Sequence, residues 1–143
     1  MSYAGDYSFA DLQEGMECER EYHINSAVYN AFLETFGDTS RIHVDDAYAE
    51  MHGFKGRVMH GAILNGFLSQ FIGLHFPGPR GLLLTCDIRY LKPCYLGDKL
   101  RLKAKITQKL ESRRVVVLDV SFFNENQDYV AANCRVKVGV MLE

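Results

Sequence analysis

The feature that most constrains this chain is a nearly uninterrupted apolar segment that runs from Gly61 to Leu74. The polar side chains within it are those of Asn65, Ser69 and Gln70. At helical spacing this composition leaves almost no polar face, so such a helix must be buried on several sides. At about 1.5 Å per residue it forms a rod about 21 Å long, which the rest of the chain has to cover.

The second half of the chain supplies this cover as alternating apolar and polar residues, which is the pattern of strands with one face in water. One such segment runs from Asp98 to Thr107, and others occupy residues 116–122 and 130–140. Short turn-like connections between them predict that these last three strands form an antiparallel meander. A fourth apolar row, further upstream, consists of Leu84, Cys86, Ile88 and Tyr90.

Two shorter helices are predicted in the first half of the chain. Ser26 is expected to cap a helix whose apolar residues recur at helical spacing up to Phe36, and Gly37 is expected to end it. Asp45 is expected to cap a second helix, which ends at Gly53.

Long, twisted antiparallel strands with one apolar face can curl around a single apolar helix. We therefore predict an α+β protein with the hotdog fold, in which a curled antiparallel sheet wraps a long central helix. A chain of 143 residues, 48% of them apolar, suits one such domain over residues 1–143. Because this sheet leaves an exposed edge strand, a homodimer or a dimer of dimers is expected.

Composition and charge argue against a nucleic-acid or membrane protein. The net charge of -2 gives no general attraction to nucleic acid or to an anionic membrane. No apolar stretch reaches membrane-spanning length, and Met1–Arg20 contains no apolar run flanked by basic residues. One strand carries a basic row, interpreted as a solvent face that discourages edge pairing. The row consists of Lys99, Arg101, Lys103 and Lys105.

The cysteines and histidines form no familiar metal or disulfide pattern. No two cysteines are arranged as Cys-x-x-Cys, which favours reduced thiols in the cytoplasm. The spacing of His43, His52 and His60 matches no local metal motif, so no metal is expected. The cysteines are Cys18, Cys86, Cys94 and Cys134.

The first candidate site lies between the two shorter helices. Asp38 follows the expected end of one helix, and His43 precedes the expected start of the next, so neither is expected on a regular helix face. A turn can bring the two side chains together, where a carboxylate and an imidazole can orient one water and transfer a proton. Asp and His are also common in turns, where they cap helices and make hydrogen bonds to backbone groups. Spacing alone therefore leaves both interpretations open.

The second candidate site lies where the apolar helix begins, at His60 and Gly61. Free N–H groups at a helix start can stabilise a developing oxyanion, and Gly61 allows a ligand to approach the backbone closely. Alternatively, Gly61 relieves packing between helix and sheet, and His60 is a hydrogen-bonded structural residue.

The order of these motifs resembles the MaoC-like hydratases and dehydratases, which are hotdog proteins and include (R)-specific enoyl-CoA hydratases. The resemblance spans about Phe9 to Val138. The residues that carry it are, in chain order, Gly37, Asp38, His43, Asp45, Asp46, Tyr48, Ala49, Val58, Met59, His60, Gly61, Lys92, Pro93, Gly97 and Asp98.

The resemblance implies a lyase of fatty acid metabolism that reversibly adds water to a trans-2-enoyl thioester, with R stereochemistry. Asp38 and His43 would hold the water, and the N–H of Gly61 would bind the thioester oxygen. His60 and Ser40 complete the implied substrate-binding set. Coenzyme A or acyl carrier protein would carry the substrate, and no metal or organic cofactor is required.

Two positions differ from the pattern of that family. Where the family has Asn-Pro, this chain has Ser40-Arg41. Ser40 keeps a small hydrogen-bonding group with a shorter reach, whereas Arg41 lacks the rigid turn of proline and adds a cation beside the pair. Some hydratases also carry a serine at the position of Gly66.

Two other functions remain open at this point. A hotdog thioesterase binds similar ligands, and many such enzymes place a catalytic carboxylate on or just before the central helix. No Asp or Glu occurs between Glu50 and Asp87, so a thioesterase of this kind would have to use Asn65 instead. A non-catalytic acyl-thioester-binding protein is favoured by the Ser40-Arg41 replacement. Hydration of crotonyl-CoA and release of free coenzyme A distinguish these alternatives.

Overall fold

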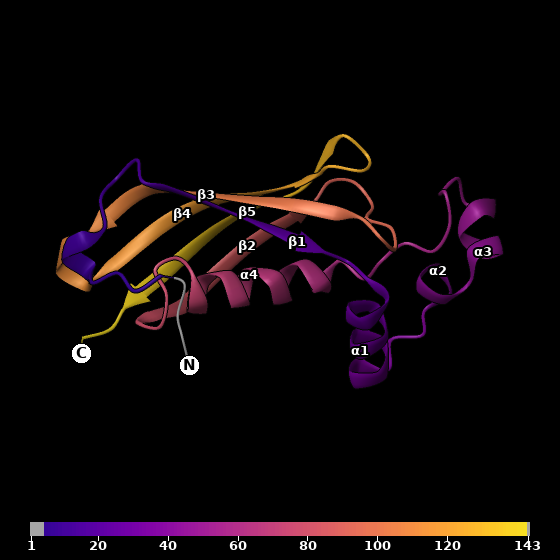
Figure 1. Ribbon diagram of the computed structural model, residues 1–143, viewed down its shortest axis with the longest axis horizontal. Coiled ribbons are helices and arrows are strands. Elements are labelled where there is room, and N and C mark those ends of the chain that lie inside the picture. The colour runs from indigo at the N-terminus through magenta and orange to yellow at the C-terminus, as the bar shows by residue number, and fades with distance from the viewer. Residues whose placement is uncertain (1–4, 143) are drawn as a thin grey trace.

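The computed structural model describes residues 5–142 and shows a five-stranded antiparallel sheet of order β1-β3-β4-β5-β2, which lies over one long helix (Figure 1). The strands are β1 (Glu17–His23), β2 (Gly81–Tyr90), β3 (Lys99–Leu110), β4 (Val115–Asn124) and β5 (Tyr129–Val140). The helices are α1 (Ser26–Phe36), α2 (Arg41–Val44), α3 (Asp46–Met51) and α4 (Ala62–Leu74). Residues 1–4 and 143 of the predicted domain, and with them the first part of Met1–Arg20, lie outside the described residues.

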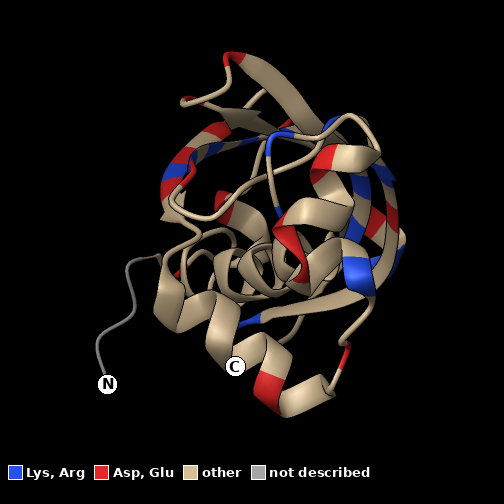
Figure 2. Ribbon diagram, turned by 90° about the vertical axis from the view of Figure 1, so that its right-hand side faces the viewer, with Lys and Arg blue, Asp and Glu red and all other residues tan. Residues whose placement is uncertain are grey.

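The central helix α4 forms where the apolar pattern predicts it. Leu68 and Phe71 are fully buried, and Ile63, Leu64 and Ile72 are nearly so. Viewed from its end, the sheet arches over this helix (Figure 2). Within residues 5–142, no helix combines the length and apolar character needed to cross a membrane.

The predicted meander of the last three strands is confirmed, because β3 pairs with β4 and β4 pairs with β5, both antiparallel. Their apolar rows face α4, and Leu102, Leu118 and Val136 are fully buried. The row predicted in β5 is wrong at its first residue. A shift in the pairing register near Phe122 leaves Val130 exposed, while the adjacent residues Ala131 and Ala132 are both buried.

The basic row of β3 faces outward, on a surface where acidic and basic residues alternate (Figure 2). Arg101 pairs with Glu19 at 3.4 Å and with Glu125 at 2.8 Å, and Lys103 pairs with Glu19 at 3.4 Å. These partners explain why basic residues recur on this face without requiring a polyanionic ligand.

Strand β1 lies in a segment where the sequence pattern predicts no strand. Four of the seven residues 17–23 are charged, and only Cys18 and Tyr22 pack against the core, so the apolar row is too sparse to be recognised from the sequence. Their place beside β3 follows from cross-strand charge pairing, with Glu17 opposite Lys105 and Glu21 opposite Arg101. Pairs of this kind stabilise antiparallel neighbours even where little apolar surface is available.

Of the apolar row predicted in residues 84–90, only Ile88 packs against the core. Leu84, Cys86 and Tyr90 are exposed, because β2 is the last strand of the sheet and pairs on one side with β5. A register shift at Leu83/Thr85 also changes which residues face inward, so Leu83 packs against the core in place of Leu84. An apolar sheet edge is therefore left in contact with solvent.

Two of the helix-end predictions differ from the structure: the cap of α1, and the end of α3, which has His52 rather than Gly53 as its C-cap. Asn25, rather than Ser26, caps α1, and its side-chain oxygen accepts from the N–H of Val28 at 2.9 Å. Gly37 ends α1 in the left-handed conformation with φ 66°, as expected from its lack of a Cβ. Asp45 caps α3 as predicted and accepts from the N–H of Tyr48 at 3.0 Å.

All four cysteines are free thiols, and two of them are deeply buried. Burial is the main cause that raises the pKa values of Cys94 and Cys134 to about 12. A thiol with this pKa carries about a thousandfold less thiolate near pH 8 than an ordinary cysteine. We therefore expect iodoacetamide to modify both residues at least about 100-fold more slowly in the native protein than in denaturant. Peptide mass spectrometry measures this difference, and equal rates in the two states would contradict it.

Candidate active site

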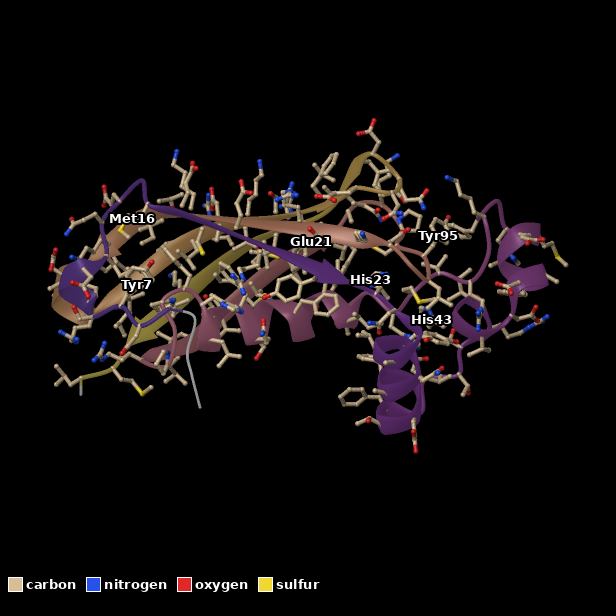
Figure 3. All side chains as sticks on the ribbon, viewed as in Figure 1. Tyr7, Met16, Glu21, His23, His43 and Tyr95 are labelled. Carbon is tan, nitrogen blue, oxygen red and sulfur yellow. The ribbon has the colours of Figure 1, made fainter. Side chains whose placement is uncertain are left out.

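The structure brings Asp38 and His43 together, as expected. Asp38 follows α1, and His43 Nε2 lies 3.8 Å from its Oδ2 atom. The expectation that neither residue belongs to a helix is wrong for His43, which lies in the one-turn helix α2. Figure 3 shows His43 at the end of the sheet where α1, α2 and the start of α4 meet.

Two hydrogen bonds, each accepted by a backbone carbonyl oxygen, fix the position of His43. Its Nδ1 atom lies 2.7 Å from the carbonyl oxygen of Val58, and its own carbonyl oxygen accepts from the hydroxyl of Tyr29 at 2.6 Å. A carbonyl oxygen can only accept, so Nδ1 carries the proton in the neutral ring. The unprotonated Nε2 atom of the neutral ring is therefore the one that faces Asp38.

His60 holds the backbone of the pair rather than pointing away from it. Its side chain is buried, and Nε2 donates to the carbonyl oxygen of Asp38 at 2.9 Å. The rings of His60 and His43 lie with their centroids 4.0 Å apart, and Phe32 packs on His60 at 4.7 Å. His60 Nδ1 has no hydrogen-bond partner among residues 5–142. His60 is thus placed to position Asp38 and His43.

Ser40 acts through its backbone. Its N–H donates to Asp38 Oδ1 at 3.2 Å, and its carbonyl oxygen accepts from the N–H of His43 at 2.8 Å. Its side chain makes no capping hydrogen bond to α2. Ser40 therefore links the carboxylate to the helix that carries the imidazole.

The charge of Arg41 is directed away from the pair, contrary to expectation. Its guanidinium pairs with Asp45 at 3.1 Å and lies 4.2 Å from the ring centroid of Tyr48. The N–H of Tyr48 and the Arg41 guanidinium both lower the pKa of Asp45. Arg41 thus connects α2 to α3 instead of placing a cation between Asp38 and His43.

The backbone at Ser40-Arg41 already has the conformation that Asn-Pro imposes. Ser40 has φ -50° and ψ 134°, an extended conformation suited to a residue before proline, and Arg41 occupies the first helical position. We therefore expect Arg41→Pro to fold and to change the free energy of unfolding by less than about 1 kcal/mol, because the chain-entropy gain offsets the lost ion pair. Chemical denaturation measures this change, and a loss above about 3 kcal/mol, the cost of a misplaced proline, would contradict it.

A mostly apolar groove of about 620 Å³ adjoins the pair, and we call it the His43 groove. His43, His60 and Gly61 line it together with an apolar wall. The N–H of Gly61 donates no backbone hydrogen bond to another described residue. The apolar wall includes Ile24, Met59, Leu64, Leu91 and Pro93.

Of the two reasons expected for glycine at residue 61, the structure supports close packing between helix and sheet. A Cβ at this position would lie 3.0 Å from two ring atoms of Tyr90, so an aromatic ring, rather than a ligand, approaches this side of the backbone. The sequence pattern places Tyr90 in an apolar row and predicts no part in the site for Tyr29 or Phe32. Tyr29 and Phe32 are three residues apart and lie on one face of α1, and this spacing could have indicated that both contact the same site.

Asn65 and Gly66 line a different groove. This groove, of about 740 Å³, lies between α1 and α4, and we call it the α1–α4 groove. The side-chain oxygen of Asn65 accepts a hydrogen bond from the hydroxyl of Tyr90. Apart from its chain neighbours and the backbone of its own helix, no atom lies within 4 Å of a Cβ built at Gly66, so a serine would fit there but would face this second groove.

Of the basic residues near the site, Arg57 is already engaged. Its side chain lies 3.3 Å from the carboxylate of Asp46 and 5.2 Å from the ring centroid of Tyr29. Lys92, by contrast, lines the His43 groove and is the better placed of the two to meet an anionic group of a ligand.

Asp38, His43 and His60 place three donor atoms within 4.8 Å of one another. Imidazole lone pairs lie in the ring plane, and the two rings are inclined by only 31° with their faces toward each other. Two nearly parallel rings do not direct their nitrogens to one point, so this cluster suits proton handling better than metal coordination.

The sheet curled over α4, with a carboxylate–imidazole pair at its end, defines a hotdog protein of the hydratase type. The family model described as "MaoC like domain" matches residues 8–124. The chain belongs to this MaoC-like family, so the predicted resemblance and fold class are confirmed.

Individual relatives agree with this assignment. The chain is 27% identical over 108 residues to an (R)-specific enoyl-CoA hydratase of Rhodospirillum rubrum, covering 76% of this chain and 75% of that protein. It is 27% identical over 106 residues to a 3-hydroxybutyryl-CoA dehydratase of Methylorubrum extorquens, covering 74% and 68%. An unliganded R-hydratase from Pseudomonas aeruginosa superposes with a TM-score of 0.89 at 26% identity, covering 99% of this chain and 90% of that chain.

Proposed function

We propose that this protein reversibly adds water to a trans-2-enoyl thioester and forms the (R)-3-hydroxyacyl thioester. The observation that carries the proposal is the facing pair of Asp38 and His43 beside an apolar groove that also holds the unpaired N–H of Gly61. The names of the related hydratases support the same reaction and its stereochemistry.

The proposed reaction uses the fixed tautomer of His43. The 3.8 Å between His43 Nε2 and Asp38 Oδ2 exceeds a direct hydrogen bond and suits two groups that share one water. Asp38 accepts one hydrogen bond from this water, while Nε2 removes its other proton as the oxygen bonds to the β-carbon. The resulting imidazolium faces the Asp38 carboxylate, which stabilises it.

The electron pair displaced from the double bond moves onto the thioester oxygen, which the N–H of Gly61 stabilises. His43 Nε2 then returns its proton to the α-carbon, so that one water has been added across the double bond. The acyl chain occupies the apolar wall of the His43 groove, and Lys92 is placed to meet the anionic carrier, coenzyme A or acyl carrier protein. The protein's own residues supply every proton transfer, so no metal or organic cofactor is proposed.

Purified protein tests the proposal with crotonyl-CoA. Loss of the enoyl absorbance together with formation of (R)-3-hydroxybutyryl-CoA is the expected result. Release of free thiol without hydration would replace the proposal with a thioesterase. Binding of crotonyl-CoA without either reaction would replace it with a carrier of acyl thioesters.

We also propose a cytoplasmic homodimer. The free cysteines are consistent with a reducing compartment. The β2 edge exposes apolar side chains, among them Leu82 and Leu84, whereas the opposite edge, β1, is charged. Pairing of two β2 edges would cover this apolar surface.

We expect Leu84→Lys to convert the dimer to a monomer, because a charge on each β2 edge opposes pairing. Light scattering coupled to gel filtration measures the mass. Leu142→Lys is the matched control, since Leu142 is also exposed but lies outside β2. A wild-type monomer, or an L84K dimer, would refute pairing through this edge.

A further inference from the structure

Two apolar grooves meet at the beginning of α4. The His43 groove holds the catalytic pair, and the α1–α4 groove lies beyond it between the two helices. Ala62 lines both grooves, so they adjoin at the first residue of α4. The α1–α4 groove continues the apolar surface, with Phe32, Ile63 and Phe67 among its lining residues.

Tyr90 stands at the boundary between these grooves. It is the last residue of β2 and lines the His43 groove, while its hydroxyl donates to Asn65, which lines the α1–α4 groove. Its ring also lies against Gly61, where a Cβ would be only 3.0 Å from two ring atoms. The side chain therefore spans from the sheet edge to the first turn of α4.

The hydrogen bond holds the ring across this boundary. Tyr90 is 51% exposed in the single chain, and its bond to Asn65 fixes the direction of the hydroxyl. Burial raises the pKa of the Tyr90 hydroxyl, which therefore remains a donor to Asn65 at neutral pH.

We propose that Tyr90, held by Asn65, limits the length of the acyl chain by closing the His43 groove against the α1–α4 groove. This inference rests on the proposed function. A short enoyl chain is accommodated beside His43, whereas the distal carbons of a longer chain meet the Tyr90 ring. Removing the ring joins the two grooves, and the distal carbons of the longer acyl chain then lie along Phe32 and Phe67.

The test compares trans-2-octenoyl-CoA with crotonyl-CoA. Each buried methylene contributes about fourfold in affinity, so four additional methylenes give ample range for a change in preference. In Tyr90→Ala we expect the ratio of kcat/KM values, octenoyl over crotonyl, to rise at least about tenfold. Asn65→Ala and Tyr90→Phe, which lose the hydrogen bond but keep the ring, give smaller rises. Tyr95→Phe, which loses a tyrosine hydroxyl outside both grooves, leaves the ratio unchanged.

A binding measurement separates this inference from the proposed reaction. Calorimetry with butyryl-CoA and octanoyl-CoA gives a ratio of Kd values that needs no turnover. If the wild type binds both ligands without hydrating enoyl thioesters, the proposed reaction is wrong, and the Kd ratio in Y90A still decides the role of Tyr90. A ratio that is the same in wild type and in folded Y90A overturns the role of Tyr90. Failure of the wild type to bind either ligand overturns both proposals.

Discussion

Replacing Asp38 with Asn is expected to lower kcat/KM for crotonyl-CoA hydration by about 10²–10⁴-fold, the usual contribution of a positioned acid–base group. The amide keeps an oxygen that can accept from the N–H of Ser40, and the carbonyl bond to His60 belongs to the backbone. The fold is therefore preserved while the negative charge facing His43 is lost. Steady-state kinetics, with circular dichroism to verify folding, measures the effect.

The matched control is Asp119→Asn on the outer face of the sheet, where Asp119 pairs with Arg135 at 3.0 Å. This variant is expected to retain full activity. The variant His43→Ala should lose activity to a similar degree as D38N. Because the two side chains act on one water, the double variant should lose little more than either single variant. Losses that multiply in the double variant would contradict a shared role.

Replacing Phe71 with Ala is expected to lower the free energy of unfolding by about 3–5 kcal/mol, the range for a fully buried phenylalanine. Phe71 is completely buried in α4 and packs against Phe76 with ring centroids 6.4 Å apart. The loss combines the transfer free energy of the ring with the cavity left beneath the sheet. Since domains of this kind are stable by only about 5–15 kcal/mol, this one change removes a large share.

Urea denaturation measures this loss, and Phe36→Ala is the control. Phe36 lies in α1 with 69% of its surface exposed, so its truncation should cost less than about 1 kcal/mol. If F71A does not fold, Phe71→Leu keeps most of the apolar volume and should lose roughly 1–2 kcal/mol. Equal losses at Phe71 and Phe36 would show that α4 is not the centre of the core.

The parts of the fold that were predictable are those in which local pattern and tertiary burial agree. Most apolar residues of α4 lie in the core, and the apolar members of the alternating rows in β3 and β4 are buried there as well. Sequence periodicity therefore identifies these elements. β1 was missed because only two of its residues, Cys18 and Tyr22, pack against the core, and its glutamates lie opposite basic residues of another strand. The inward face of β2 was wrong because a register shift is set by pairing with β5, which a single segment does not reveal.

At the site, sequence spacing indicated that Asp38 and His43 could meet, but it left their role open and did not show what holds them. The Val58 carbonyl that fixes the imidazole is a backbone atom, and no side-chain pattern encodes it. The part played by Tyr90 depends on contact between the end of β2 and the start of α4, which are far apart in the chain. The direction of Arg41 likewise depends on α3, because its partner Asp45 is fixed as the cap of that helix.

The unlike character of the two sheet edges also determines how large an assembly can grow. The apolar β2 edge of one protomer can pair with the β2 edge of a second protomer about a two-fold axis. After that pairing neither protomer has a free apolar edge. What remains outward on each side is β1, whose acidic residues Glu17, Glu19 and Glu21 repel the same edge of another molecule. In the proposed dimer, strand-by-strand addition would therefore end after a single step, which would protect the protein from forming open fibrils through its sheet.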